Sequence, residues 1–154
     1  MDRSVEAKIA DELAIRELVA RYCHGIAERD DKAWAETWAV DGEWKVLGQE
    51  VRGRDAILAL YQKLVSTLRW VVQVASDGVI ELAGDVATGR WQILETIQAK
   101  DGRALINVGR YRDRYRRDAD GKWRFACREF RFSYSGPPDY SAESVPPEGW
   151  KAGS

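Results

Sequence analysis

The chain has 154 residues, of which 45% are apolar, and its 24 Lys and Arg nearly balance its 25 Asp and Glu. This length and composition are typical of a single domain around one hydrophobic core. A formal net charge of -1 gives no general attraction to nucleic acid or to an anionic membrane surface, so we expect neither as a partner.

Histidine and cysteine are scarce in this sequence. His24 is the only histidine, and Cys23 and Cys127 are the only cysteines. This scarcity argues against a histidine metal site, a disulfide framework and any Ser-His-Asp triad that does not use His24. The chain also has no run of 18 apolar residues and no apolar signal segment after Met1. The sequence therefore predicts a cytoplasmic protein that works without a metal or another cofactor.

The first part of the chain is predicted to be helical. Residues 7–28 carry apolar side chains at helical spacing, which predicts a long amphipathic helix. Its stripe consists of Ile15, Leu18, Val19, Tyr22 and Ile26. Asp30 and Asp31 are suited to cap a short second helix with Trp34 and Trp38 on one face.

A strand and a third helix are predicted next. Asp41 and Gly42 form a turn signal that leads into a strand through Trp44 and Val46. Asp55 is suited to start the third helix, whose apolar residues keep helical spacing as far as Leu68.

Alternating apolar and polar residues predict strands in the second half of the chain. The strands fall at residues 79–82, 85–100, 103–117 and 122–134. Their short connections, each containing glycine, predict antiparallel neighbours. Helices followed by a meander indicate an α+β fold, with the helices on one face of a curved antiparallel sheet. We expect one domain over residues 1–135 and an irregular, proline-rich arm over 136–154.

The predicted strands have mixed faces. Leu105, Asn107 and Tyr111 share one face, which favours an apolar pocket with a few polar groups. The arginines at 110, 112 and 114 share the other face, and a solvated face or subunit edge is favoured there over anion binding. We expect Trp91 and Ile93, with the apolar edge at 106 and 108, to face away from the pocket and to produce a homodimer or homotrimer.

Several short segments carry a family resemblance when their order and spacing are taken together. They are Ala14 to Leu18 with Arg21 and Tyr22, Trp38 to Trp44, Arg52-Gly53, Tyr111 to Asp113, and Gly121 to Phe125 with Arg128. The chain resembles the SnoaL-like branch of the nuclear-transport-factor-2-like superfamily, which includes dehydratases, a dehydrochlorinase and lyases of lignin-derived aromatic dimers. The resemblance implies a cone, in which a curved sheet and three helices enclose a cavity.

The resemblance also implies a departure from the usual chemistry of that family. Several relatives use an Asp on the first helix together with a His on the strand after the third helix. Those positions fall on Ala27 and Gln73 here, and neither side chain can act as a base. His24 and Asp30 remain possible replacements, although a surface position for His24 and a capping role for Asp30 are favoured.

We interpret the chain as a cofactor-independent lyase acting by dehydration, another elimination or deformylation on a hydrophobic, aromatic small molecule. The catalytic candidates are Tyr22, Tyr111 and Arg128, with a tyrosine moving a proton and the arginine stabilising an oxyanion. The substrate-binding candidates are Trp44, Gln73, Gln92, Asn107 and Phe132. Two alternatives remain open, a non-catalytic binding protein and an accessory subunit of an oxygenase.

Overall fold

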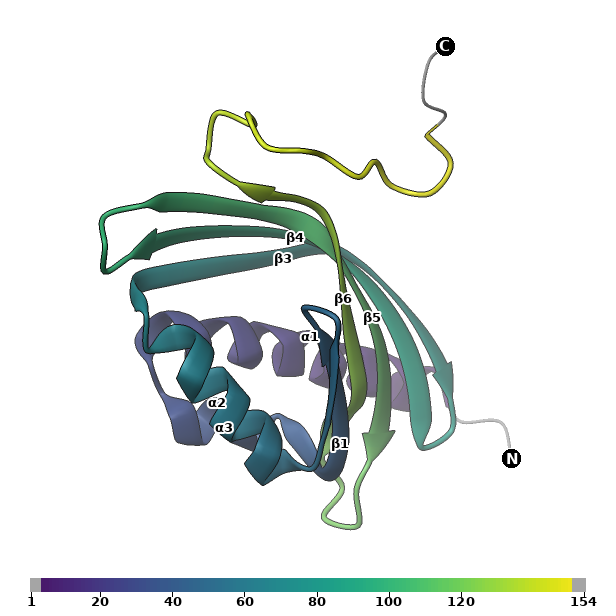
Figure 1. Cartoon of the computed structure of the whole chain (residues 1–154). Helices are drawn as coiled ribbons and strands as arrows, with labels where there is room; N and C mark the ends of the chain where they lie inside the picture. Colours follow the sequence, from purple (N-terminus) through teal and green to yellow (C-terminus); the bar gives the residue numbers. More distant parts are fainter. Residues whose placement is uncertain (1–3, 151–154) are drawn as a thin grey trace.

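The computed structural model describes residues 4–150 and shows three helices packed against one strongly curved sheet (Figure 1). The helices are α1 (Val5–Glu28), α2 (Asp31–Glu36) and α3 (Arg54–Val65). The strands are β1 (Trp38–Val46), β2 (Gln49–Arg52), β3 (Leu68–Ala83), β4 (Val86–Ala99), β5 (Ala104–Arg117) and β6 (Trp123–Gly136). The α+β cone expected from the sequence is confirmed.

The ends of the helices follow from local hydrogen bonds. The hydroxyl of Ser4 accepts from the backbone N–H of Ala7 at the start of α1. The helix ends at Glu28, and Arg29 after it adopts the left-handed conformation with φ 57°. Asp30 caps α2 by accepting from the N–H of Ala33 at 2.9 Å, so its expected capping role is confirmed.

The sheet has the strand order β2-β1-β6-β5-β4-β3. Neighbouring strands are antiparallel except β1 and β6, which run parallel. The predicted turn at Asp41 and Gly42 is wrong, because both residues lie within β1, where pairing with β6 is interrupted between Trp38 and Glu43. Strand β2 was not predicted, and β3 begins eleven residues before the predicted 79–82, since it starts at Leu68.

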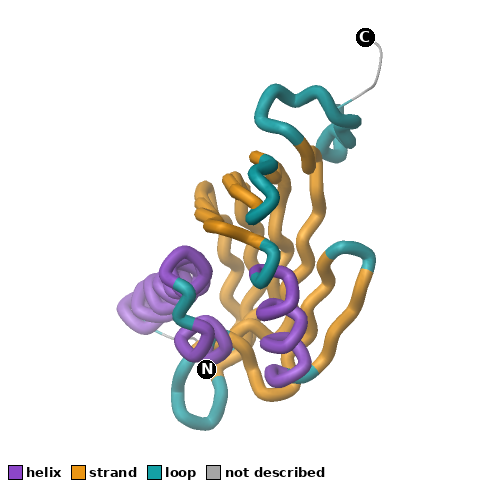
Figure 2. The backbone as a smooth tube through the Cα atoms, turned by 60° about the vertical axis from the view of Figure 1, so that its left-hand side comes forward, coloured by secondary structure: helices purple, strands orange, loops and turns teal. Residues whose placement is uncertain are grey.

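The concave face of the sheet carries the core, and α1 packs across it (Figure 2). Trp91 and Ile93 point to this face and are buried, so the prediction that they face outwards is wrong. Their neighbour Gln92 points the other way and is exposed, because successive side chains of a strand alternate between faces. Both side chains belong to the buried core, and the guanidinium of Arg16 on α1 lies over the ring of Trp91, so they do not need a partner subunit to shield them from water.

The convex face of the sheet nevertheless presents apolar side chains to solvent. Trp70, Val72 and Val74 of β3 and Leu94 of β4 are all more than 40% exposed. The register places Val74 beside Leu94 and Leu94 beside Val108, so these side chains form a continuous surface across three strands. We call Trp70, Val72, Val74, Leu94, Ile106 and Val108 the outer patch.

Beyond β6 the chain turns back along the convex face. The hydroxyl of Tyr134 donates to the carbonyl of Pro137, and the N–H of Val145 donates to the carbonyl of Ser133. Glu148 pairs with Arg112 and Arg131 on the same face. Residues 1–3 of the expected domain and residues 151–154 of the expected arm lie outside the described residues. The division into a domain over residues 1–135 and an arm over 136–154 stays a prediction.

None of the helices within residues 4–150 has the length and apolar character needed to cross a bilayer.

We predict that the outer patch is covered by a second or third copy of the chain, because water would otherwise contact this apolar surface. Sedimentation at micromolar concentration should show a dimer or trimer. Leu94→Lys, which places a charge in the patch, should shift the protein towards the monomer. Val86→Lys changes a valine outside the patch that is somewhat more exposed than Leu94, and it should leave the assembly intact. A wild-type protein that sediments as a monomer would contradict the prediction.

Candidate functional site

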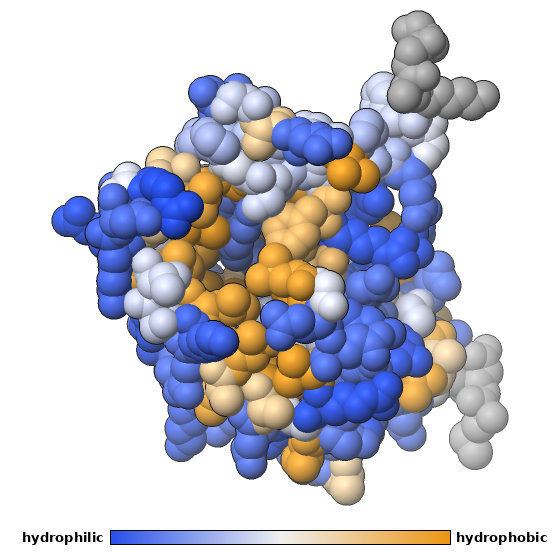
Figure 3. Space-filling model, viewed as in Figure 1, coloured by the Kyte–Doolittle hydropathy of each residue, from blue (hydrophilic) through white to orange (hydrophobic). Residues whose placement is uncertain are grey.

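A cavity of about 300 Å³ lies between α1, α3, the β1–β2 hairpin and the concave face of the sheet. Apolar side chains gather around its opening, which appears as the hollow at the centre of Figure 3. Aromatic and aliphatic residues form most of the wall: Tyr22, Ile26, Trp44, Val46, Leu47, Tyr61, Leu64, Val65, Leu68, Val71, Ile97, Leu105, Tyr111, Phe130 and Phe132. The other lining residues are Thr67, Gln73, Glu95 and Asn107.

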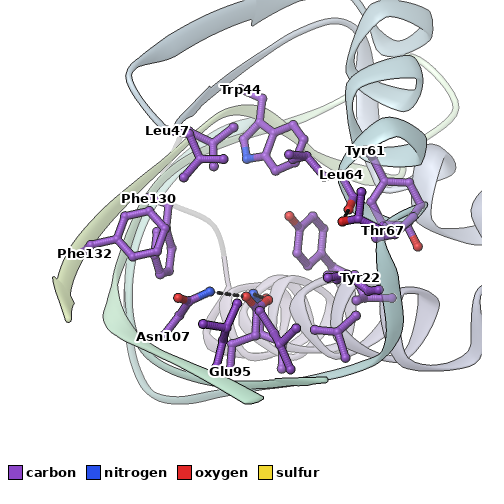
Figure 4. A pocket seen from close by; sticks show the side chains of 18 of the residues that line it. Tyr22, Trp44, Leu47, Tyr61, Leu64, Thr67, Glu95, Asn107, Phe130 and Phe132 are labelled. Atoms are coloured by element: carbon purple, nitrogen blue, oxygen red, sulfur yellow. Dashed lines mark hydrogen bonds between the residues drawn. The ribbon is translucent and has the colours of Figure 1, made fainter. Parts of the chain in front are cut away.

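Six of the residues singled out from the sequence line this cavity. They come from five elements far apart in the sequence and are Tyr22, Trp44, Gln73, Asn107, Tyr111 and Phe132. Figure 4 shows the hydroxyl of Tyr22 directed into the cavity and the ring of Phe132 on the opposite wall. The fold therefore brings these side chains together around one space, while their functional roles stay predictions.

Glu95 of β4 is the polar group that sequence reasoning missed. Its Oε2 accepts from Nε2 of Gln73 at 2.8 Å, and its Oε1 accepts from Nδ2 of Asn107 at 2.7 Å (Figure 4). Each carboxylate oxygen thus receives one amide N–H and keeps further acceptor capacity. Asn107 is held in turn by the hydroxyl of Ser135, which donates to its Oδ1 at 2.7 Å. The two amides orient the carboxylate at the cavity wall.

Burial raises the pKa of Glu95 above the ordinary value, although the hydrogen bonds from Asn107 and Gln73 lower it in part. A carboxylate with a raised pKa is a stronger base than an exposed one. Glu95 is therefore the cavity group best suited to accept a proton from a bound molecule.

A chain of hydrogen bonds connects this carboxylate to the two tyrosines. Nε2 of Gln73 also donates to the hydroxyl of Tyr111 at 3.2 Å, and the hydroxyls of Tyr111 and Tyr22 lie 3.3 Å apart. Either hydroxyl of this pair can be the donor. Both tyrosines line the cavity, so the hydroxyl that accepts within the pair keeps an O–H that it can donate to a bound molecule.

Arg128 and Asp113 form an ion pair that is completely buried behind the tyrosines. Nε of Arg128 donates to Oδ1 of Asp113 at 2.9 Å, and Nη2 donates to Oδ2 at 3.0 Å. The guanidinium carbon lies 3.6 Å from the ring centre of Tyr111, 4.3 Å from that of Tyr22 and 4.1 Å from that of Phe125. Burial by itself would lower the pKa of Arg128, but Asp113 outweighs it and the pKa lies above its ordinary value.

This pair corrects the role predicted for Arg128. The guanidinium is absent from the cavity wall, because its two paired nitrogens face Asp113 and its faces pack on aromatic rings. Asp113 braces an arginine of the neighbouring strand, as the sequence suggested. Arg128 therefore lies behind Tyr22 and Tyr111, in contact with both rings, and is not part of the cavity wall.

Other predicted candidates lie away from the cavity. Gln92, expected among the substrate-binding residues, is exposed on the convex face and does not line this cavity. The side chain of His24 is 74% exposed and lies 3.5 Å from Glu28 of the same helix. Ala27 is exposed near the end of α1. Within residues 4–150, no cluster of three or more His, Cys, Asp or Glu is arranged to hold a metal ion.

Glycine at position 109 lets the wall of the cavity close. A Cβ there would collide with the carbonyl oxygen of Arg131 and would lie 2.9 Å from the ring of Phe130. Without that atom, β5 and β6 approach closely at a bulge, and the ring centre of Phe130 lies 5.0 Å from that of Tyr111.

A curved sheet that encloses an apolar cavity together with three N-terminal helices is the cone architecture of nuclear-transport-factor-2-like proteins. The SnoaL-like domain model matches residues 7–129. The chain therefore belongs to the SnoaL-like domain family.

Solved structures agree with this assignment. A variant of Rv3472, a Mycobacterium tuberculosis protein of unknown function, is 33% identical, with a TM-score of 0.75 over 84% of this chain and 76% of the other. An NTF2-like protein with a cystatin-like fold from Novosphingobium aromaticivorans is 28% identical, with a TM-score of 0.69 over 82% and 84%. Hexachlorocyclohexane dehydrochlorinase LinA-type3 from Novosphingobium barchaimii is 24% identical, with a TM-score of 0.81 over 94% and 100%. No curated protein matches the sequence significantly.

We predict that breaking the buried ion pair is far more costly than breaking an exposed one. Asp113→Asn leaves the guanidinium of Arg128 buried without its counter-charge, which should lower the free energy of unfolding by about 3–5 kcal/mol. Urea denaturation measures this change. Asp101→Asn, which weakens the exposed pair with Arg103, is the control and should change stability little. Equal decreases in the free energy of unfolding for the two substitutions would contradict the prediction.

Proposed function

We propose that the protein is a cofactor-independent lyase that eliminates a small leaving group from a hydrophobic, aromatic molecule held in the cavity, with Glu95 as the general base. The observation that carries the proposal is a carboxylate oriented by two amides in a mostly apolar cavity, with the hydroxyl of Tyr22 facing the same space. The dehydrochlorinase among the structural neighbours is an elimination enzyme, which supports the same reaction class.

The proposed reaction needs only groups that face the cavity. For a β-hydroxy ketone, Glu95 takes the proton from the carbon next to the carbonyl group, and the C–H electron pair forms an enolate. The enolate reforms the carbonyl, makes the carbon–carbon double bond and expels the β-hydroxyl. The departing oxygen takes the proton from the carboxylic acid of Glu95 and leaves as water. The carboxylate is restored, so the cycle is balanced in atoms and charge.

Tyr22 is assigned a hydrogen-bonding role in this scheme. Burial raises its pKa well above the ordinary value, and Tyr111 raises it further, while Arg128 only partly opposes them. A tyrosine with such a pKa holds its proton, so it stabilises an enolate oxygen by donating a hydrogen bond. This assignment replaces the expectation that a tyrosine moves the proton itself.

The wall of the cavity supports an aromatic substrate. Phe130 and Phe132 form one side, with ring centres 4.3 Å apart, and Trp44 closes another. Flat rings bury large apolar areas against such walls and gain from edge-to-face contacts. A volume of about 300 Å³ suits a molecule with one or two rings.

We predict that Glu95→Gln lowers the turnover of aryl β-hydroxy ketones by about 100-fold to 10,000-fold, because the amide cannot accept the proton. Formation of the conjugated enone, followed by its ultraviolet absorbance, measures the rate. Glu81→Gln, on the exposed part of β3, is the matched control and should retain the wild-type rate. Binding of the ketones without turnover by the wild-type protein would favour the alternative, a non-catalytic binding protein.

The local structure can accept Glu95→Gln without unfolding. The new amide would face two N–H donors, from Gln73 and Asn107. Rotation of the Asn107 side chain by a half-turn presents its oxygen to residue 95 and its NH₂ to the hydroxyl of Ser135, which can also accept. A melting temperature near the wild-type value should accompany the loss of rate.

We also predict a characteristic pH dependence. The base must be ionised, and burial raises the pKa of Glu95 from its ordinary value of 4.5. As the pH decreases, activity should therefore begin to fall at a higher pH than it would for a carboxylate with the ordinary pKa of 4.5. Asn107→Ala removes a hydrogen bond that lowers this pKa, so the acid limb of kcat/KM should move to still higher pH. An acid limb unchanged by Asn107→Ala would count against Glu95 as the titrating group.

A further inference from the structure

The ionisable groups that the described residues place on the cavity wall include a carboxylate but no cation. Among the described residues that line the cavity, Glu95 is the only carboxylate, and none is Lys, Arg or His. The other ionisable lining groups are Tyr22, Tyr61 and Tyr111, and burial raises the pKa of each. At neutral pH these tyrosines carry no charge, so an ionised Glu95 gives the cavity a net negative charge.

The nearest buried cation does not cancel this charge. Arg128 uses two of its nitrogens to pair with Asp113, so the pair as a whole is neutral. The aromatic faces of Tyr22 and Tyr111 cover the guanidinium. The hydrogen-bond donors on Glu95 are the neutral amides of Gln73 and Asn107, which orient the carboxylate without neutralising it.

The remaining surfaces of the cavity also favour a positive ligand. Each oxygen of Glu95 has one amide donor and retains acceptor capacity, while an ammonium group offers three N–H donors. The rings of Phe130, Phe132 and Trp44 line the same space, and the faces of aromatic rings attract cations. A ligand carboxylate would be repelled by Glu95 across a medium of low dielectric constant.

We propose that the cavity binds hydrophobic amines in their protonated form, with the ammonium group against Glu95, and rejects carboxylates of the same shape. This inference takes from the proposed function only the location of the ligand site, which is the cavity around Glu95. Applied to the proposed lyase, it means that substrates enter uncharged and that hydrophobic amines compete with them, because an ammonium group occupies the base.

A set of three probes with one ring system tests this inference. Binding of 1-naphthylmethylamine, 1-naphthylmethanol and 1-naphthoate to the full-length protein is measured by titration calorimetry at pH 7.5. We expect the amine to bind at least about tenfold more tightly than the alcohol, and the alcohol at least about tenfold more tightly than the carboxylate.

The variant Glu95→Gln should abolish this order. The affinity for the amine should fall by about tenfold or more, that for the carboxylate should rise, and that for the alcohol should stay within about threefold. Glu81→Gln, with its exposed side chain, should preserve the wild-type order. The binding experiment does not depend on turnover. Failure of the elimination assay would therefore not contradict amine binding, and failure of amine binding would not contradict the proposed elimination.

Three outcomes would overturn the proposal. The first is a carboxylate that binds the wild-type protein as tightly as the alcohol. The second is a preference for the amine that persists in Glu95→Gln. The third is the absence of measurable binding for all three probes.

Discussion

The buried ion pair between Arg128 and Asp113 is the interaction on which the rest of the site depends. Both side chains are fully enclosed, and their separation from water is tolerable only because two parallel hydrogen bonds join them. The guanidinium packs against the rings of Tyr22 and Tyr111 and does not line the cavity, so a charge behind the wall supports the rings that carry both hydroxyls. Replacing the pair by apolar residues would keep a core but would remove the support for this hydrogen-bonded chain.

The polar groups of the cavity wall form a chain of hydrogen bonds that begins at the two tyrosines supported by this ion pair. Tyr111 accepts from Gln73, Gln73 donates to Glu95, and Asn107 holds the other oxygen of the carboxylate. Neutral amides suit this position, because a lysine or arginine would neutralise Glu95 and lower its pKa. The resemblance predicts that Gln73 stands where several relatives have a histidine, and in the structure Gln73 donates to the carboxylate of Glu95 on the neighbouring strand.

The sequence predicted the fold better than the site, for a physical reason. The three helices and the hairpins of the meander depend on local periodicity and turn residues, which short segments carry by themselves. The inward face of β4 depends on which side α1 packs, and both faces of that strand contain apolar residues, so Trp91 and Ile93 were assigned to the wrong side. Glu95 shares their face, and correct placement of Trp91 would have identified it as an inward carboxylate.

Arg128 shows a second limit of sequence reasoning. A buried arginine is costly, which indicated a functional role, and Asp113 was recognised as a brace for an arginine. No local pattern indicated that two nitrogens of the guanidinium would pair with Asp113, that Nη1 would be buried without a hydrogen-bond partner among the described residues, or that the cavity wall would be left to the two tyrosines.

The arrangement of polar groups on the cavity wall has a stereochemical consequence. The paired hydroxyls of Tyr22 and Tyr111 offer a hydrogen, and Glu95 offers a lone pair, at two distinct places on the wall. Phe130 and Phe132 form a third, apolar point of contact. Three different contacts distinguish a molecule from its mirror image, so in the proposed reaction the tetrahedral carbon would present one particular hydrogen of its two to Glu95. The cavity is thus chiral in its hydrogen bonding as well as in its shape.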